Sequence, residues 1–181
     1  MPRKETITKR YLMDTAFLMA KQEGLENVTA RKLAAKAGCS TQPIFRLYEN
    51  MEDLWKDIFE QAVEFYSFYY DRSKRVSEEP FVDLGYAYIK FAEDEPNLFK
   101  MLFLGDKRFD KSFYEILNGK NGVVGTEMGR AKSAGVANPG DLFTKMWIFI
   151  HGAACMTITG DYDLGDADTI ELLKSTYRSF K

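Results

Sequence analysis

The stretch from 28 to 54, VTARKLAAKAGCSTQPIFRLYENMEDL, constrains the fold of this 181-residue chain more than any other segment. Thr29 precedes a run with good helix propensity, and its hydroxyl can accept a hydrogen bond from an N–H group of the first turn. Gly38 ends that helix, because glycine readily adopts the left-handed conformation that a helix end often needs. Ser40 can cap a second short helix, about residues 41–47. Two short helices around a glycine-containing turn predict a helix-turn-helix, whose second helix enters the major groove of DNA.

The same stretch resembles the N-terminal domain of the TetR family of transcriptional regulators. The resemblance has no gap over GLENVTARKLAAKAGCSTQPIFRLYENMEDLW, and the residues that carry it are Gly24, Val28, Thr29, Leu33, Ala34, Ala37, Gly38, Ile44, Phe45, Tyr48, Asn50, Glu52, Asp53 and Leu54. It implies an all-α protein with a three-helix helix-turn-helix DNA-binding domain, residues 1–50. It also implies a helical ligand-binding and dimerisation domain, residues 51–181, whose first helix, about 51–73, connects the two.

The distribution of charge agrees with a DNA-binding segment at the N-terminus. The net charge of the chain is −2, but residues 1–50 hold nine basic and five acidic residues, a net charge of +4. Residues 51–181 hold 16 basic and 22 acidic residues, a net charge of −6. A basic terminal segment on an acidic body is the electrostatic pattern of a terminal DNA-binding domain, although ordinary charge scatter in a soluble protein produces such a difference too.

Composition excludes several other classes of protein. The two cysteines, Cys39 and Cys155, form no disulfide framework and no metal-ligand spacing. The N-terminus has no apolar signal segment, and no apolar run approaches the ~20 residues that a membrane helix needs. We therefore expect a cytoplasmic protein with no membrane span, no cofactor and no metal.

Helical periodicity and helix-ending residues predict helices along the whole chain. The expected helices cover 6–23, 30–37, 41–47, 51–73, 81–93, 96–104, 141–159 and 168–180, with Pro80 beginning the fifth. Glycines between residues 107 and 135 predict a kinked helix or two pieces there. The 141–159 helix is apolar on nearly all sides, which predicts burial on several sides.

The resemblance to the TetR family extends into this helical body. The segment YIKFAEDEPNLFKMLF and the element made by Trp147, His151 and Gly152 are similar to the ligand-binding domain of one TetR subgroup. By resemblance, the helices over 141–159 and 168–180 form a four-helix homodimer interface. A helix that is apolar on more than one face needs a second partner, which a self-complementary two-fold contact supplies.

The candidate DNA-binding residues lie in the N-terminal arm, the two motif helices and the following helix. They are Lys4, Thr29, Arg31, Lys32, Ser40, Thr41, Gln42, Pro43, Phe45, Arg46 and Lys56. In the family's founding member the arginine that matches Arg31 contacts bases, and arginine can pair with guanine O6 and N7. Gln42 can read adenine or bridge to phosphate. The arm with Lys4 either adds phosphate or minor-groove contacts or is a frayed terminus.

Three residues depart from the family pattern, and each removes a polar DNA contact. Phe45 stands where a tyrosine hydroxyl usually meets phosphate, Leu47 where histidine or tyrosine is common, and Met51 where a lysine usually holds the DNA backbone. These departures imply either weaker phosphate anchorage or a shifted docking. They also keep open an alternative, a helical regulatory protein that acts through protein partners.

Aromatic residues in the body are candidates for a small-molecule pocket. The candidates are Phe65, Tyr69, Tyr86, Phe91, Phe99, Phe103, Phe113, Phe143, Trp147 and His151. Such lining is typical of a ligand pocket and equally of a core, so both interpretations stand for each residue. The scarcity of charge in these segments favours an apolar or aromatic effector. His151, the only histidine, is either a hydrogen-bonded core residue or a ligand contact, and it belongs to no triad that would indicate an enzyme.

These observations together predict a ligand-responsive TetR-type regulator, most often a repressor. It would bind a palindromic double-stranded DNA operator as a homodimer, with half-sites ~34–36 Å apart. A small-molecule effector would release it from DNA. The opposite sign of regulation, activation, stays open at this point.

Overall fold

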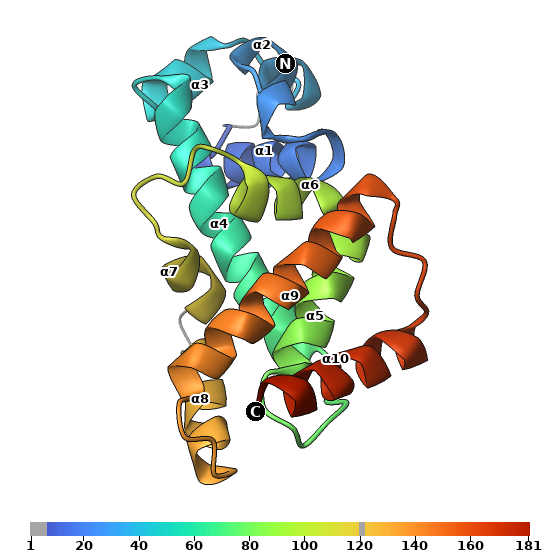
Figure 1. Ribbon diagram of the computed structural model, residues 1–181. Helices are drawn as coiled ribbons and strands as arrows, with labels where there is room; N and C mark the ends of the chain where they lie inside the picture. The colour runs from blue at the N-terminus through green and yellow to red at the C-terminus, as the bar shows by residue number, and fades with distance from the viewer. Residues whose placement is uncertain (1–6, 120–121) are drawn as a thin grey trace. The chain divides into compact units, whose positions relative to one another are not determined.

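The computed structural model describes residues 7–119 and 122–181, and within them all regular secondary structure is helical (Figure 1). The α-helices are α1 (Lys9–Glu23), α2 (Ala30–Lys36), α3 (Gln42–Leu47), α4 (Met51–Arg72), α5 (Val82–Asp94), α6 (Pro96–Phe99), α7 (Phe113–Asn118), α8 (Val123–Ser133), α9 (Pro139–Thr159) and α10 (Asp166–Phe180). A 3₁₀-helix, η1 (Leu25–Asn27), follows α1, and a π-helical segment, η2 (Lys100–Leu104), follows α6. The predicted all-α fold class is confirmed.

The chain divides into two compact units. The first contains Met1–Val63 and Asn97–Asp110, and the second contains Glu64–Pro96 and Lys111–Lys181. The boundary between the two compact units falls inside α4, between Val63 and Glu64. The functional division into residues 1–50 and 51–181 stays a prediction.

Capping residues set most helix boundaries in the first unit. Thr29 caps α2, since its hydroxyl accepts the Lys32 N–H at 3.3 Å, and Gly38 has a φ of +67°, so both predictions are confirmed. The prediction that Ser40 caps the next helix is wrong. Thr41 precedes α3 in a right-handed helical conformation and forms no side-chain cap, so the extended conformation from which a side chain reaches the first N–H groups is missing. Asn50 accepts from the first turn of α4.

A small apolar core holds the first three helices of the first unit together. Its fully buried or nearly buried members are Leu12, Ala16, Met19, Ala20, Val28, Leu33, Ala34, Ala37, Ile44 and Tyr48. Leu25, in η1, is only half-buried. The Tyr48 hydroxyl donates to Asp57 Oδ2 at 3.0 Å, and burial together with this hydrogen bond raises the pKa of Tyr48. The predicted 96–104 helix is instead two segments, α6 and η2, and Asn97 Nδ2 donates to the Lys21 carbonyl of α1 at 3.0 Å.

The second unit is built around α5, which packs along α9, and α10 packs against both (Figure 1). Helix α5 begins at Val82, so the prediction that Pro80 begins it is wrong. The reason is Phe81, whose φ of +65° interrupts the helix and whose N–H donates to Glu127 Oε2 at 2.5 Å. The region between residues 107 and 135 forms two helices, α7 and α8, which was one of the two predicted alternatives.

Helix α9 is buried on one face only within a single chain. Its buried residues are Leu142, Met146, Ile150, Ala153 and Ala154. Ile148 is 68% exposed and Met156 is 47% exposed, so the expected burial on several sides is not met inside one chain. The expectation that no apolar run approaches the length of a membrane span is also wrong, because an 18-residue window of this 21-residue helix has a mean hydropathy of 1.2. One such helix is weak evidence for a membrane, since core helices of soluble proteins share its composition.

Candidate nucleic-acid interface

Helices α2 and α3 form a helix-turn-helix whose inner faces are apolar and whose outer faces are exposed. The exposed candidates are Thr29, Arg31, Lys32, Ser40, Gln42, Phe45, Arg46 and Lys56, and the half-buried ones are Thr41 and Pro43. Lys4 lies outside the described residues. Ten of the eleven candidates are thus exposed or half-buried. Their contacts with DNA stay predictions.

Helix α3 is anchored by a single buried side chain. Ile44 is 1% exposed, whereas Phe45 is 51% exposed and Leu47 is 37% exposed. In a helix this short, one inward residue leaves its other side chains free to contact a partner. Two of the three departures from the family pattern, Phe45 and Leu47, therefore lie on the exposed surface of α3 and not in the core.

Some basic residues around the motif already form hydrogen bonds or ion pairs within the protein, and others do not. Lys32 Nζ donates to Asn27 Oδ1 at 2.7 Å, and Lys36 pairs with Glu23 at 2.9 Å, which lowers the pKa of the Glu23 carboxyl. Within residues 7–119 and 122–181, Arg31 and Arg46 form no ion pair or side-chain hydrogen bond. Their guanidinium groups are available for charge-assisted hydrogen bonds to phosphate or base acceptors.

Trp55 connects α4 to the start of the helix-turn-helix. Its indole N–H donates to the Val28 carbonyl at 2.9 Å, and Val28 directly precedes the Thr29 cap of α2. Sequence reasoning missed this residue. The one sequence feature that could have indicated its role is its position, in the first turns of the helix that follows the motif.

The predicted ligand-pocket residues do not all belong to one compact unit. Phe99 and Phe103 belong to the first unit, are fully buried, and have ring centroids 5.2 Å apart. The other eight belong to the second unit. For Phe99 and Phe103 the burial supports the core interpretation.

Four of those eight form a continuous aromatic cluster. Phe143 stacks on Trp147 with ring centroids 6.3 Å apart, and Trp147 stacks on His151 at 5.5 Å. The Phe113 ring lies edge-on to His151, with ring centroids 6.0 Å apart. Tyr88, which sequence reasoning missed, has its hydroxyl 2.9 Å from His151 Nδ1, and burial raises the pKa of Tyr88. This geometry supports the hydrogen-bonded core interpretation of His151, and a ligand contact stays a prediction.

Three other candidates line a cleft of about 390 Å³ in the second unit. These are Phe65, Tyr69 and Tyr86, and the cleft is also lined by Arg72 and Lys90. Phe91 lies fully buried against Tyr69, with ring centroids 5.2 Å apart. The volume lies within the range of small-molecule sites, about 300–1,000 Å³. With Lys74, three basic residues line the cleft, and they make the lining less apolar than the sequence led us to expect.

Across the described ranges, no group of three or more histidine, cysteine, aspartate or glutamate residues could hold a metal ion. Cys39 and Cys155 are free and half-buried, and burial raises the pKa of the Cys155 thiol.

An all-helical chain with a helix-turn-helix in its first compact unit belongs to the class of all-α helix-turn-helix folds. Within that class, the chain has the fold of TetR-family transcriptional regulators, as the resemblance implied. It is similar to a TetR-like regulator from Rhodococcus sp. RHA1, with a TM-score of 0.66, 12% identity, and coverage of 93% of this chain and 92% of that one.

Two further structures have the same fold. A TetR-family regulator from Haemophilus influenzae RD has a TM-score of 0.64 and 15% identity, with 93% of each chain covered. The fatty acid degradation regulator FadR from Bacillus halodurans has a TM-score of 0.64 and 14% identity, with 97% of this chain and 96% of that one covered. No protein-family model and no curated protein matches the chain. Identities this low establish the shared fold alone.

Proposed function

We propose that this protein is a TetR-type transcriptional regulator that binds double-stranded DNA by placing α3 in the major groove. The observation that carries the proposal is the arrangement of α3, which is held by Ile44 alone and presents Gln42, Phe45 and Arg46 outward. Regulators with the same fold support it. Helix-turn-helix proteins read bases with the N-terminal residues of the second helix.

Each exposed polar residue of the motif has a chemical role in this proposal. Gln42 reads the N6 and N7 edge of adenine, and Arg31 pairs with O6 and N7 of guanine. Arg46 and Lys56 contact phosphate, which fixes the position of the protein on the duplex without reading sequence. Thr41 contacts either a base or phosphate.

The protein acts as a homodimer in this proposal, with α9 and α10 at the interface. The exposed apolar residues Ile148 and Met156 on α9 support it, because a two-fold contact would remove them from water. A dimer reads a palindrome whose half-sites lie ~34–36 Å apart. A cytoplasmic location, where the DNA is, follows from the same proposal.

A small apolar or aromatic effector controls the protein, which functions as a repressor. The cleft lined by Phe65, Tyr69 and Tyr86 is of suitable size to hold it. An effector that favours the DNA-incompetent state by about 3 kcal/mol weakens operator binding roughly 150-fold.

A second candidate function is regulation through protein partners with weakened DNA reading. Phe45 and Leu47 favour it, because both are apolar and exposed on α3. Exposed large apolar residues are common in the cores of protein interfaces. The two functions differ in their salt dependence, since binding to several phosphates weakens steeply as salt rises.

The decisive experiment is selection of bound sequences from a random pool of DNA duplexes. The wild type and the control Lys132→Ala, an exposed change on α8, should both enrich one palindromic motif. Arg31→Ala should bind that motif about 5- to 150-fold more weakly, the value of one bidentate base contact. The recovered operator then allows effectors to be screened by release.

The absence of an enriched motif at low salt, with folded dimeric protein, would contradict the DNA-binding proposal. The candidate that acts through protein partners would then take its place. Equal loss of binding in Arg31→Ala and Lys132→Ala would contradict the role of Arg31.

A further inference from the structure

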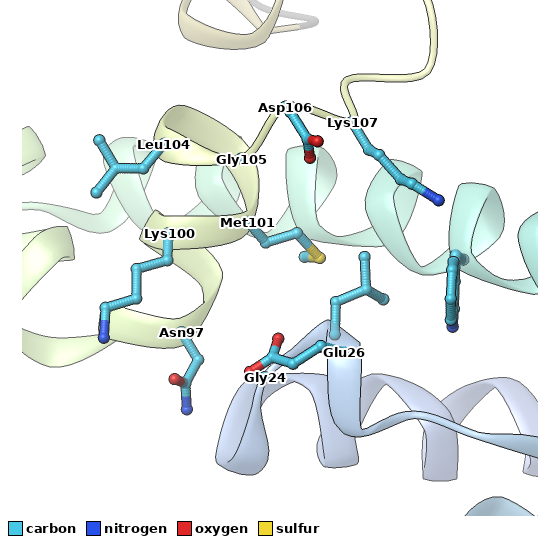
Figure 2. Close-up of a pocket in the computed structure, with 11 residues that line it drawn as sticks. Gly24, Glu26, Asn97, Lys100, Met101, Leu104, Gly105, Asp106 and Lys107 are labelled. Carbon is cyan, nitrogen blue, oxygen red and sulfur yellow. The ribbon is translucent and has the colours of Figure 1, made fainter.

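The first compact unit contains a cleft of about 530 Å³ that no predicted site residue lines (Figure 2). We call it the head cleft, and its principal lining residues are Leu25, Glu26, Trp55, Met101, Asp106 and Lys107. They come from η1, α4, η2 and the segment that follows η2. Every residue that lines the head cleft belongs to the first unit.

Apolar side chains form one part of the head cleft. Met101 is buried, and Leu25 and Trp55 are half-buried. Half-buried apolar groups that line a concave space bury more area when a ligand enters, which favours a ligand with an apolar body.

Carboxylates form the second part of the lining. Figure 2 shows the Glu26 and Asp106 side chains turned toward the space between η1 and η2, whereas Lys100 extends away from it. Gly24 permits this position of Glu26, because a Cβ at Gly24 would overlap Glu26 Oε1. Neither carboxylate has an ion pair or side-chain hydrogen bond to another described residue.

Two lysines line the head cleft, Lys100 and Lys107, and Lys107 lies over an aromatic ring. Lys107 Nζ lies 4.9 Å from the centroid of the Trp55 ring, which is the geometry of a cation–π contact. Lys107 is exposed and lies outside regular helix, so its side chain can leave that position at low cost.

We propose that the head cleft binds a small organic ammonium ion with an apolar body. Its cationic group takes the place of Lys107 over Trp55, with Glu26 and Asp106 as counter-charges. Its apolar body packs against Leu25 and Met101. The order of preference among ligands is therefore cation, then neutral analogue, then anion.

The head cleft also connects to the helix-turn-helix through one hydrogen bond. Trp55 donates to the Val28 carbonyl at 2.9 Å, next to the Thr29 cap of α2. A ligand on the face of Trp55 therefore changes operator affinity without acting through the second unit. This regulatory consequence rests on the proposed DNA-binding function, whereas the binding site itself does not.

Nuclear magnetic resonance of the two indole N–H groups tests the binding site. The full chain is titrated with benzyltrimethylammonium, and Trp55→Phe assigns the two signals, since Trp55 and Trp147 are the only tryptophans. The Trp55 signal should shift and saturate. Benzyl alcohol and phenylacetate should bind at least tenfold more weakly. A shift of the Trp147 signal alone, or tighter binding of phenylacetate, would overturn the proposal.

Three substitutions of exposed residues sharpen this test, and each should leave the protein folded. Glu26→Gln and Asp106→Asn should each weaken cation binding about two- to fivefold, the range for screened ion pairs. Lys107→Ala should tighten it, because a competing cation is removed. The matched control Glu49→Gln, an exposed carboxylate away from the head cleft, should bind as the wild type does. Weaker binding by Lys107→Ala would overturn the proposal.

Operator binding with and without saturating benzyltrimethylammonium tests the coupling. The wild type should change its operator affinity, whereas Trp55→Phe, which keeps a ring but has no indole N–H, should bind the cation in calorimetry without that change. An unchanged wild-type affinity would overturn the coupling. Saturable binding in a protein that selects no DNA would leave the site standing while the proposed function fails.

Discussion

At the scale of single residues, Glu127 is a buried carboxylate that joins two segments of the second unit. Its side chain is 2% exposed, and its two oxygens accept from the Phe81 N–H at 2.5 Å and from Arg130 Nη1 at 2.7 Å. Arg130 in turn donates to the Glu78 carbonyl at 2.9 Å. Glu127 thus accepts a hydrogen bond from the backbone N–H of Phe81, the left-handed residue before α5, which has no side-chain helix cap.

We predict that Glu127→Ala lowers the free energy of unfolding by about 2–4 kcal/mol, because it leaves the buried Phe81 N–H without its acceptor and removes the ion pair of Arg130 with Glu127. Glu127→Gln keeps an acceptor and should lose less. The control Glu93→Ala removes an exposed pair with Lys90 and should change stability by no more than about 0.5 kcal/mol. Urea unfolding measures all three, and equal effects of Glu127→Ala and Glu93→Ala would contradict the assignment.

At the scale of helices, close packing of α5 depends on Gly85. A Cβ at this position would lie 2.9 Å from side-chain atoms of Ile150 on α9 and Leu173 on α10. The absence of a side chain therefore allows α5 to approach both neighbours. Gly129 in α8 is the opposite case, since a Cβ there would meet nothing within 4 Å.

Alanine at these two glycines should change stability in opposite directions. Gly85→Ala should destabilise the protein by about 1–3 kcal/mol through overpacking. Gly129→Ala should stabilise it by about 0.5–1 kcal/mol, because alanine loses less backbone entropy in a helix. Thermal and urea unfolding would contradict this account of the α5 packing if both substitutions stabilised the protein.

At the scale of the whole molecule, α9 carries two large apolar side chains, Ile148 and Met156, that are exposed in a single chain. Ile148 is 68% exposed in the middle of a 21-residue helix whose opposite face is core. An interface between two copies covers such a face and gives the two-fold symmetry that a palindromic operator needs.

We therefore predict that Ile148→Asp converts the proposed dimer to a folded monomer. A charge at the centre of an apolar interface is costly, whereas the same charge on an exposed surface is not. Light scattering after size-exclusion chromatography measures the mass, and circular dichroism confirms folding. Leu18→Asp, at an exposed apolar residue of α1, should leave the mass unchanged. A dimeric Ile148→Asp protein would place the interface elsewhere.

The sequence by itself determined the all-helical fold class, most of the helices and the motif of this protein. Thr29, Gly38 and Asn50 act on backbone groups within a few residues of themselves, so their caps and breaks could be predicted from local spacing. The exposed candidates on α2 and α3 could be predicted for the same reason, because helical period separates the buried Ile44 from its outward neighbours.

Only the tertiary structure decided the features that join distant segments. The left-handed Phe81 depends on Glu127, 46 residues away, and Tyr88 meets His151 across 63 residues. The head cleft needs η1, α4 and η2 together, although no one of these segments carries a recognisable motif for it. Sequence patterns reflect interactions between residues that are close along the chain. The contacts above form only when the chain closes long loops, so their partners cannot be identified from residue spacing.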